Sequence, residues 1–326
     1  MKVLVTGVFG FIGSYFTKYL LGAPKIGGEK PEELDVSIIG AGRNTNQRNV
    51  MRLEKYALDP KLRIMYLDFA RDDISDIFED VEFVLHFGAK TFVDHSIRDP
   101  FPFIESNIVG TYRILEEARK CRTLRKFIQF STDEVYGSIS TGAYTEESKL
   151  NPTNPYSATK AAGDMLALSY ANTYGLPVII TRTENNYGPY QDPQKAMPKF
   201  VRNALDSKPL PVYGDGRHRR MWLHVQDTCD ALMTLMEKGT TGQIYHIAGA
   251  QELENIELAR RILKILGKPE SLIQLVPDFN VRPGHDRRYA LNVEKLKMLG
   301  WRSRIDLDTG LNSVVNWYKT NDWWFK

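Results

Sequence analysis

Two adjacent carboxylates, Asp133 and Glu134, follow the hydroxyl of Thr132 in the stretch Phe130–Gly137. The apolar run 126–130 that precedes them predicts a buried strand. Polar groups at the carboxyl end of such a strand lie where open α/β sheets bind ligands. Neighbouring carboxylates can divide acid and base roles, because their repulsion raises one pKa and leaves the other group ionised. The stretch therefore indicates proton-transfer chemistry, with carboxylates that merely cap a loop as the alternative.

A phenol and an ammonium group follow at Tyr156 and Lys160. Asn154 and Pro155 are typical of a helix start, and positions i and i+4 share one helix face. A nearby cation favours the phenolate, so we expect Lys160 to lower the pKa of Tyr156 toward a value useful for proton transfer. The spacing alone would also fit a solvated helix face. Its place behind a strand with polar residues at its end, and behind the glycine-rich turn described next, favours catalysis.

The first strand, expected over 2–6, runs into the turn Gly7-x-x-Gly10-x-x-Gly13 and then into a helix. In this setting Gly7 permits a tight turn, Gly10 lets backbone N–H groups approach a pyrophosphate, and Gly13 lets the helix pack closely on the strand. The pattern predicts a dinucleotide site, and a glycine-rich turn without a ligand is the alternative.

The second strand, expected over 36–39, lacks the acidic residue that usually accepts hydrogen bonds from the adenosine ribose, because Gly40 stands in its place. Arg43 follows and could face a 2′-phosphate or lie flat on adenine, although a solvated loop residue also fits the pattern. Asp68, at the end of a strand expected over 62–67, is a candidate partner of the adenine amino group. We expect NAD as the cofactor, with NADP as the alternative.

Strands alternate with helices along the first half of the chain. Further strands are expected over 82–87 and 177–181, with a helix over 104–121. This alternation predicts an α/β fold with a doubly wound parallel sheet of the Rossmann type and a smaller C-terminal substrate-binding lobe. We expect residues 1–183 and 222–250 to form the dinucleotide-binding domain, and residues 184–221 and 251–326 to form the lobe.

Bulk composition argues against several other classes of protein. The 326 residues carry a formal charge of only +3 without a basic run, so neither nucleic acid nor a membrane surface is indicated as a partner. Cys121 and Cys229 have no paired spacing and indicate neither a disulfide nor a zinc site. No apolar segment approaches the roughly 18 residues of a membrane span. We expect a cytoplasmic protein without a bound metal.

Several segments together resemble the extended short-chain dehydrogenase/reductase superfamily of nucleotide-sugar enzymes and, within it, the dTDP-glucose 4,6-dehydratase family. They are Ser131–Gly137, Asn185–Gln191 and Arg282–Tyr289, beside the glycine turn and the Tyr156–Lys160 pair. The resemblance covers nearly the whole chain, and the adjacent Asp–Glu pair is its most specific element. It implies a lyase that converts dTDP-glucose to dTDP-4-keto-6-deoxyglucose by C4 oxidation, elimination of water across C5 and C6, and return of hydride to C6.

The resemblance also implies roles for individual residues. Tyr156, assisted by Lys160, would be the base at C4, whose oxygen Thr132 would orient. Glu134 would take the C5 proton, and Asp133 would protonate the departing C6 hydroxyl. The expected cofactor contacts are Gly7, Gly10, Phe11, Ile12, Gly13, Arg43, Asp68, Phe69, Phe87, Gly88, Ala89, Tyr156 and Lys160. The expected sugar-nucleotide contacts are Thr91, Asn186, Lys195, Pro211, Tyr213, Arg220, Asn255 and His285.

Four residues depart from what the resemblance implies: Gly40 at the ribose position, Lys90 and Phe92 beside the expected sugar position, and Glu184 where a small residue is common. These departures would fit an altered sugar or an altered nucleotide. A related nucleotide-sugar enzyme, such as a UDP-sugar dehydratase or a C4 epimerase, is therefore one alternative. A non-catalytic nucleotide-binding protein on the same fold is another.

The resemblance finally implies a homodimer in which helices 104–121 and 156–174 of each copy form a four-helix contact.

An epimerase would need the phenol and the ammonium group but has no use for the adjacent carboxylates. A non-catalytic protein would be expected to have lost catalytic residues, whereas the hydroxyl, both carboxylates, the phenol and the ammonium group are all retained.

Overall fold

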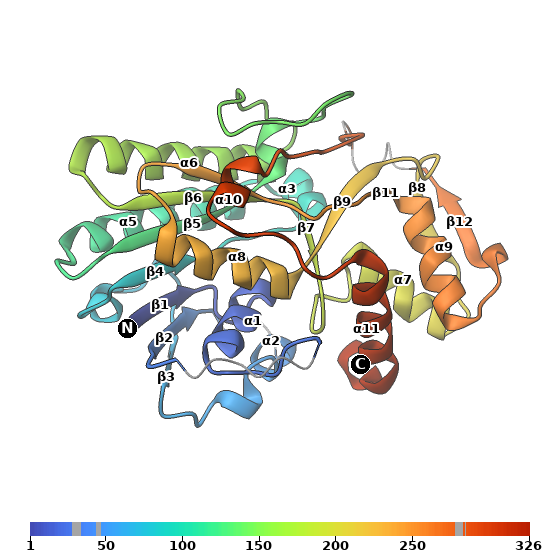
Figure 1. Ribbon diagram of the computed structural model, residues 1–326, viewed down its shortest axis with the longest axis horizontal. Coiled ribbons are helices and arrows are strands. Elements are labelled where there is room, and N and C mark those ends of the chain that lie inside the picture. The colour runs from blue at the N-terminus through green and yellow to red at the C-terminus, as the bar shows by residue number, and fades with distance from the viewer. Residues whose placement is uncertain (28–33, 44–46, 278–282, 284) are drawn as a thin grey trace.

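The computed structural model describes residues 1–27, 34–43, 47–277, 283 and 285–326. Within these ranges, the chain forms a seven-stranded sheet in the order β10-β6-β5-β4-β1-β2-β3 (Figure 1). Every neighbouring pair runs parallel, as expected for a doubly wound sheet. The strands are β1 (Lys2–Thr6), β2 (Ser37–Gly42), β3 (Leu62–Tyr66), β4 (Phe83–His86), β5 (Lys126–Thr132), β6 (Val178–Thr183) and β10 (Ile244–Ile247). The predicted fold class is confirmed.

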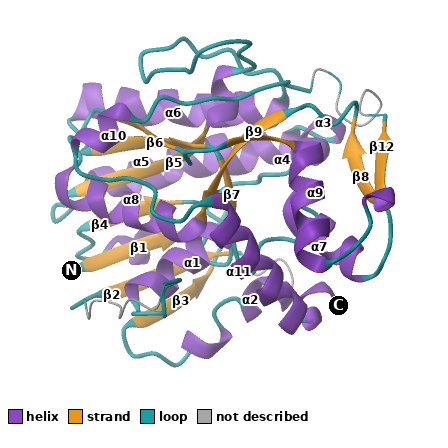
Figure 2. Ribbon diagram, turned by 45° about the vertical axis from the view of Figure 1, so that its right-hand side comes forward, coloured by secondary structure: helices purple, strands orange, loops and turns teal. Residues whose placement is uncertain are grey.

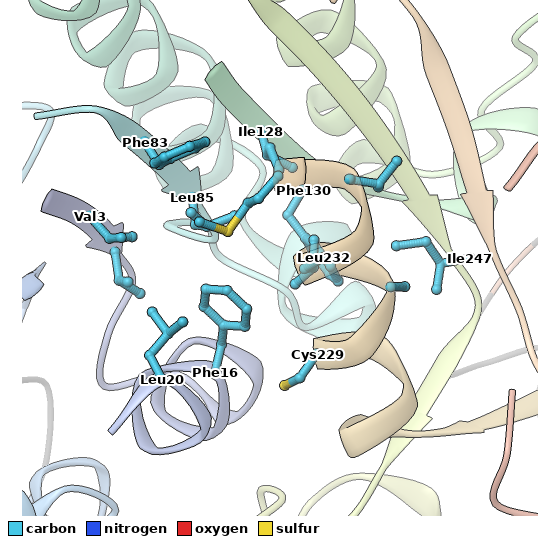
Figure 3. Packing of buried hydrophobic residues seen from close by; sticks show 14 of the residues in the cluster. Val3, Phe16, Leu20, Phe83, Leu85, Ile128, Phe130, Cys229, Leu232 and Ile247 are labelled. Carbon is cyan, nitrogen blue, oxygen red and sulfur yellow. The ribbon is translucent and has the colours of Figure 1, made fainter. Parts of the chain in front are cut away.

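Both faces of this sheet are covered by helices, because successive residues along a strand point to opposite sides. Val3 and Val5 of β1 join one hydrophobic cluster, whereas Leu4 between them joins another. The first cluster includes residues of α1 (Phe11–Leu20) and α8 (Val225–Lys238), and Figure 3 shows Phe16 of α1 and Leu232 of α8 among its members. The second cluster packs against α5 (Gly110–Lys120) and α6 (Pro155–Tyr174).

A smaller group of elements lies beyond the carboxyl end of β6 and has its own hydrophobic cluster (Figures 1 and 2). Its strands form two small sheets in the orders β11-β9-β7 and β12-β8. The strands are β7 (Asn185–Tyr187), β8 (Leu210–Tyr213), β9 (Arg219–His224), β11 (Glu252–Glu254) and β12 (Ile273–Val276). The helices around the cluster are α7 (Ala196–Leu205), α9 (Asn255–Leu266) and α11 (Leu307–Thr320).

Several boundaries differ from the expected ones. β2 continues to Gly42, whereas its end was expected at residue 39. The helix expected over 104–121 is α4 (Phe101–Ile104), a π-helical turn (Glu105–Val109) and α5 in succession. α8 was not anticipated, because it follows β9 without a loop: His224 ends the strand and its side chain accepts a hydrogen bond from the Gln226 N–H at the start of the helix.

The remaining helices are α2 (Gln47–Met51), α3 (Val93–Arg98) and α10 (Glu294–Met298). In the part of the chain that the structure describes, no helix is both long and apolar enough to cross a membrane, and no three His, Cys, Asp or Glu side chains gather to hold a metal ion. Both cysteines are free thiols. Arg282 and Gly284, in one of the segments that carry the family resemblance, lie outside the described residues.

Candidate active site

The expected catalytic hydroxyl and carboxylates lie together where β5 ends. Thr132 is the last residue of the strand, and its Oγ1 donates to Asp133 Oδ1 at 2.9 Å. The backbone N–H of Glu134 lies 3.3 Å from the same hydroxyl oxygen. Asn154 Nδ2 donates to Glu134 Oε2 at 3.4 Å, which ties the carboxylate to the start of α6. The end of β5 and the start of α6 thus bring these polar side chains together at the carboxyl edge of the sheet.

The start of α6 is fixed by local sequence, and it positions Tyr156. Asn154 and Ser157 form a capping box with Pro155 in the first turn, so the helix begins where the sequence predicted. The Tyr156 N–H, which has no acceptor in a first turn, donates to Ser96 Oγ at 3.1 Å. Ser96 carried no signal in the sequence, because α3 and α6 meet only in the folded chain.

Asp133 is the buried acid of the pair. It is 3% exposed, and burial first and the charge of Glu134 second raise the pKa of its carboxyl to about 7. Thr132 and Arg220 oppose this shift only in part. The expectation that one carboxyl of the pair has a raised pKa is confirmed for Asp133. A carboxyl that titrates near neutral pH can donate a proton to a leaving group.

The expected effect of Lys160 on Tyr156 is wrong for this geometry. Lys160 Nζ donates to the Phe130 carbonyl at 2.7 Å, and burial lowers the pKa of the ammonium group to about 8. Burial raises the pKa of Tyr156 above its ordinary value, and the charges of Glu134 and Asp133 raise it further. Desolvation and two carboxylates therefore outweigh the cation, and Tyr156 is a neutral phenol in this state.

The glycine turn has the shape that a dinucleotide requires. Gly7 has φ +67°, and a Cβ there would lie 2.8 Å from the backbone nitrogen of Gly88. A Cβ on Gly13 would lie 2.5 Å from the Gly7 carbonyl oxygen, so only glycine lets α1 pack this closely on β1. Gly10 precedes the helix, and no side chain caps its first turn at Phe11 and beyond. These N–H groups suit a pyrophosphate, so the residues fit the cofactor that the sequence predicted.

The expected adenosine contacts lie at the neighbouring strand ends. Arg43 Nη1 lies 3.1 Å from Asp68 Oδ2, which joins the residues that follow β2 and β3. Phe69 lies close to Gly88, whose Cβ, if it had one, would be 2.8 Å from the Phe69 ring. Phe87 packs into the core against Phe130 and Phe16, with ring centroids 4.9 and 5.9 Å away, and is followed directly by Gly88 and Ala89.

Asn107 holds the segment that follows Ala89. Its Oδ1 accepts from the Lys90 N–H at 2.8 Å, and its Nδ2 donates to the Lys90 carbonyl at 3.1 Å and to Thr159 Oγ1 at 3.0 Å. Thr91 and Lys195, both expected substrate contacts, meet beyond this point: Lys195 Nζ donates to the Thr91 carbonyl at 3.1 Å and lies 4.5 Å from the centre of the Phe92 ring.

The other expected substrate contacts gather on the smaller group of elements. Arg220 Nη2 lies 3.2 Å from His285 Nε2, and the Tyr213 ring stands edge-on to His285 at 6.3 Å. The backbone N–H of Asn255 donates to the carbonyl of His218, whose ring stacks on His285 at 4.2 Å. Pro211 lies two residues before Tyr213 on β8.

Asn186 uses both ends of its side-chain amide in hydrogen bonds within the protein. Its Nδ2 donates to Thr183 Oγ1 and to the Glu184 carbonyl, both at 3.0 Å, and its Oδ1 accepts from Thr228. Neighbouring Asn185 is only half-buried. The repeat Asn185-Asn186 marked this place in the sequence, but only the fold distinguishes the two amides.

Glu184 adds a third carboxyl group near the catalytic pair. Thr132 and Thr183 are register partners at the ends of β5 and β6, so Asp133 and Glu184 each follow one of them. Both carboxyl oxygens of Glu184 are buried without a hydrogen-bond partner among the described residues. Burial, followed by the charge of Asp133, raises the pKa of Glu184 well above its ordinary value.

Comparison with known proteins gives a consistent picture. The family described as GDP-mannose 4,6 dehydratase matches residues 4–314. A dTDP-glucose 4,6-dehydratase from Streptomyces niveus is 42% identical, with 99% of this chain and 95% of the relative covered. A trifunctional UDP-glucose 4,6-dehydratase from Arabidopsis thaliana is 39% identical over 99% of this chain and 48% of its own length. The crystal structure of DesIV, a dTDP-glucose 4,6-dehydratase from Streptomyces venezuelae with NAD and TYD bound, superposes with a TM-score of 0.90 at 40% identity and covers 99% of this chain and 98% of that one.

Proposed function

The chain belongs to the GDP-mannose 4,6-dehydratase family of extended short-chain dehydrogenases/reductases, and we propose that it removes water from a nucleotide-diphosphate sugar, with dTDP-glucose as the favoured substrate. The observation that carries this proposal is the Asp133–Glu134 pair at the end of β5. It combines a buried carboxyl whose pKa is raised to about 7 with a carboxylate held by Asn154. The product would be the 4-keto-6-deoxy sugar.

The first step is oxidation at C4, in which Tyr156 takes the hydroxyl proton. Thr132 orients the C4 oxygen, and Lys160 stabilises the site as a buried cation beside Tyr156 on α6. A bound nicotinamide would accept the hydride from C4 and later return it to C6, and its positive ring would favour the phenolate. The positive ring matters for this step, because burial and the charges of Glu134 and Asp133 otherwise keep Tyr156 neutral.

Elimination then uses the two carboxyl groups separately. The 4-keto group acidifies the C5 proton, which Glu134 removes, while Asp133 donates its proton to the C6 hydroxyl as water leaves. Glu134 would then give a proton back to C5, and return of the hydride to C6 would leave the cofactor unchanged, so the cycle loses one water. The proton that Tyr156 accepted balances the one that Asp133 gave away.

The substrate is proposed to lie between the sheet edge and the smaller group of elements. Arg220 and His285 would face the diphosphate, and Tyr213 and Pro211 would border the base. The proposed division is a dinucleotide-binding domain (1–183, 222–250) and a sugar-nucleotide lobe (184–221, 251–326). The separate hydrophobic clusters of the main sheet and the smaller sheets support it, except that Leu296 and Trp301, within 251–326, pack in the main-sheet cluster.

Two copies of the chain are proposed to associate through α4, α5 and α6. Large apolar side chains are exposed on these helices, among them Phe101, Tyr112, Met165 and Tyr174. Monomeric proteins rarely expose several such residues on adjacent elements, which supports a contact with a second copy.

Product analysis tests the proposed function. The purified protein is incubated separately with dTDP-glucose and UDP-glucose, and the nucleotide sugars are analysed by mass spectrometry. We expect loss of one water from dTDP-glucose. An isomer of unchanged mass would indicate an epimerase, dehydration of UDP-glucose alone would identify a UDP-sugar dehydratase, and no conversion of either would favour a non-catalytic role.

A further inference from the structure

The adenosine end of the proposed dinucleotide site lacks the acidic residue that usually binds the ribose, and its shape leaves no room for one. Gly40 lies inside β2, paired with Val5 on one side and Ile64 on the other. A Cβ at this position would lie 2.7 Å from Cγ2 of Val8, which is fully buried. Val8 therefore fills the space that an acidic side chain would need, and the ribose hydroxyls lose their usual acceptor.

A cation stands at the end of the same strand. β2 continues to Gly42, so Arg43 lies at its carboxyl edge. Its Nη1 is held by Asp68 Oδ2 at 3.1 Å, while the side chain remains 36% exposed. Asp68 is itself held in place, because its Oδ1 accepts from the Ala70 N–H at 2.9 Å. The ion pair thus fixes the direction of the guanidinium. Its other N–H groups make no hydrogen bond to the residues that the structure describes, and they can meet a second anion.

We propose that Arg43 determines dinucleotide specificity, and that the site accepts the 2′-phosphate of NADP because Val8 and Gly40 exclude a competing carboxylate. The proposal rests on the nicotinamide-dependent function proposed above. Without an acidic side chain at position 40, a 2′-phosphate meets no repulsion there, and Arg43 supplies charge-assisted hydrogen bonds. Asp68 offsets part of the positive charge, so we expect NAD and NADP to bind with dissociation constants within about tenfold of each other.

Equilibrium binding tests this proposal without reference to turnover. The full chain is freed of any bound dinucleotide, and NAD and NADP are each titrated by calorimetry. Arg43→Leu should weaken NADP binding by about tenfold to a hundredfold and NAD binding by less than about threefold. Arg63→Leu is the matched control, because it removes the same charge from an exposed position on neighbouring β3. It should change neither constant.

A second variant tests the claim that Val8 excludes an acidic side chain at position 40. Val8→Gly/Gly40→Asp makes room for a carboxylate and supplies it, so NAD should be favoured over NADP by at least about tenfold, with far-ultraviolet circular dichroism checking the fold. The proposal is overturned if the wild-type chain binds NADP more than about a hundredfold more weakly than NAD, or if Arg43→Leu weakens both equally, as stacking on adenine would require. Binding of neither dinucleotide would instead contradict the proposed function.

Discussion

Asp133 links the structure to a dependence on pH. Its carboxyl must be protonated to act as an acid, and burial and Glu134 raise its pKa to about 7. The rate of elimination in a single turnover should therefore fall as the pH rises through this value, and Asp133→Asn should lower it by about 10²- to 10⁴-fold. A rate that stays level from about pH 6 to pH 8 would assign the acid to another group.

Glu134 and Tyr156 should separate the two halves of the reaction. Glu134→Gln keeps the size of the side chain but removes the base. The nicotinamide should therefore become reduced and remain reduced, while the rate of product formation falls by about 10²-fold or more. Tyr156→Phe is the matched variant and should prevent reduction altogether. Absorbance of the reduced nicotinamide during a single turnover measures both. Normal turnover by the first variant, or full reduction by the second, would contradict these roles.

Glu184 predicts a dependence of stability on pH. A carboxyl whose folded pKa is raised contributes stability below its unfolded pKa and loses it as the pH rises toward the folded value. Urea unfolding of the wild type and Glu184→Gln should therefore show the Gln variant gaining relative stability above about pH 4.5, by at most ~1.4 kcal/mol per pH unit. A difference in unfolding free energy that is the same at about pH 4.5 and pH 7 would show that Glu184 ionises normally.

At the scale of elements, Asn107 connects the helix pair to the loop that follows β4. Its hydrogen bonds reach the part-buried backbone of Lys90 and the buried hydroxyl of Thr159, and Asn107→Ala removes all of them. We expect the free energy of unfolding to fall by about 1–3 kcal/mol. Hydrogen exchange of residues 89–92 should also become faster than in the wild type, and a stability loss without this local change would show that Asn107 does not hold the loop.

Local patterns predicted the elements that depend on nearby residues. The glycine turn and the Asn154 cap lie where expected, because tight turns and helix starts are decided within a few residues. The predicted lowering of the pKa of Tyr156 was wrong, because this pKa depends on burial and on the two carboxyl groups that follow β5. The environment of Glu184 could not be predicted either, since Leu291 and Arg220 approach it only in the folded chain.

At the scale of the whole molecule, the site lies where the main sheet meets the smaller group of elements (Figure 2). The helices proposed to join two copies, α4, α5 and α6, lie on the sheet side of that junction. Tyr112→Glu/Met165→Glu should shift the protein to a monomer in sedimentation velocity, because it places charges in the proposed contact. Met298→Glu, at an exposed position on α10, is the control and should leave the association unchanged. A wild-type monomer at micromolar concentration would contradict the proposed dimer.

The proposed function requires the carboxyl pair to eliminate water from the sugar by way of a proton removed at C5. Mass spectrometry of the product formed from dTDP-glucose in heavy water tests it directly. We expect a nucleotide sugar that has lost one water and carries one deuterium at C5, because the removed proton is replaced from groups that exchange with solvent. A product of unchanged mass, or a dehydrated product without deuterium at C5, would contradict it.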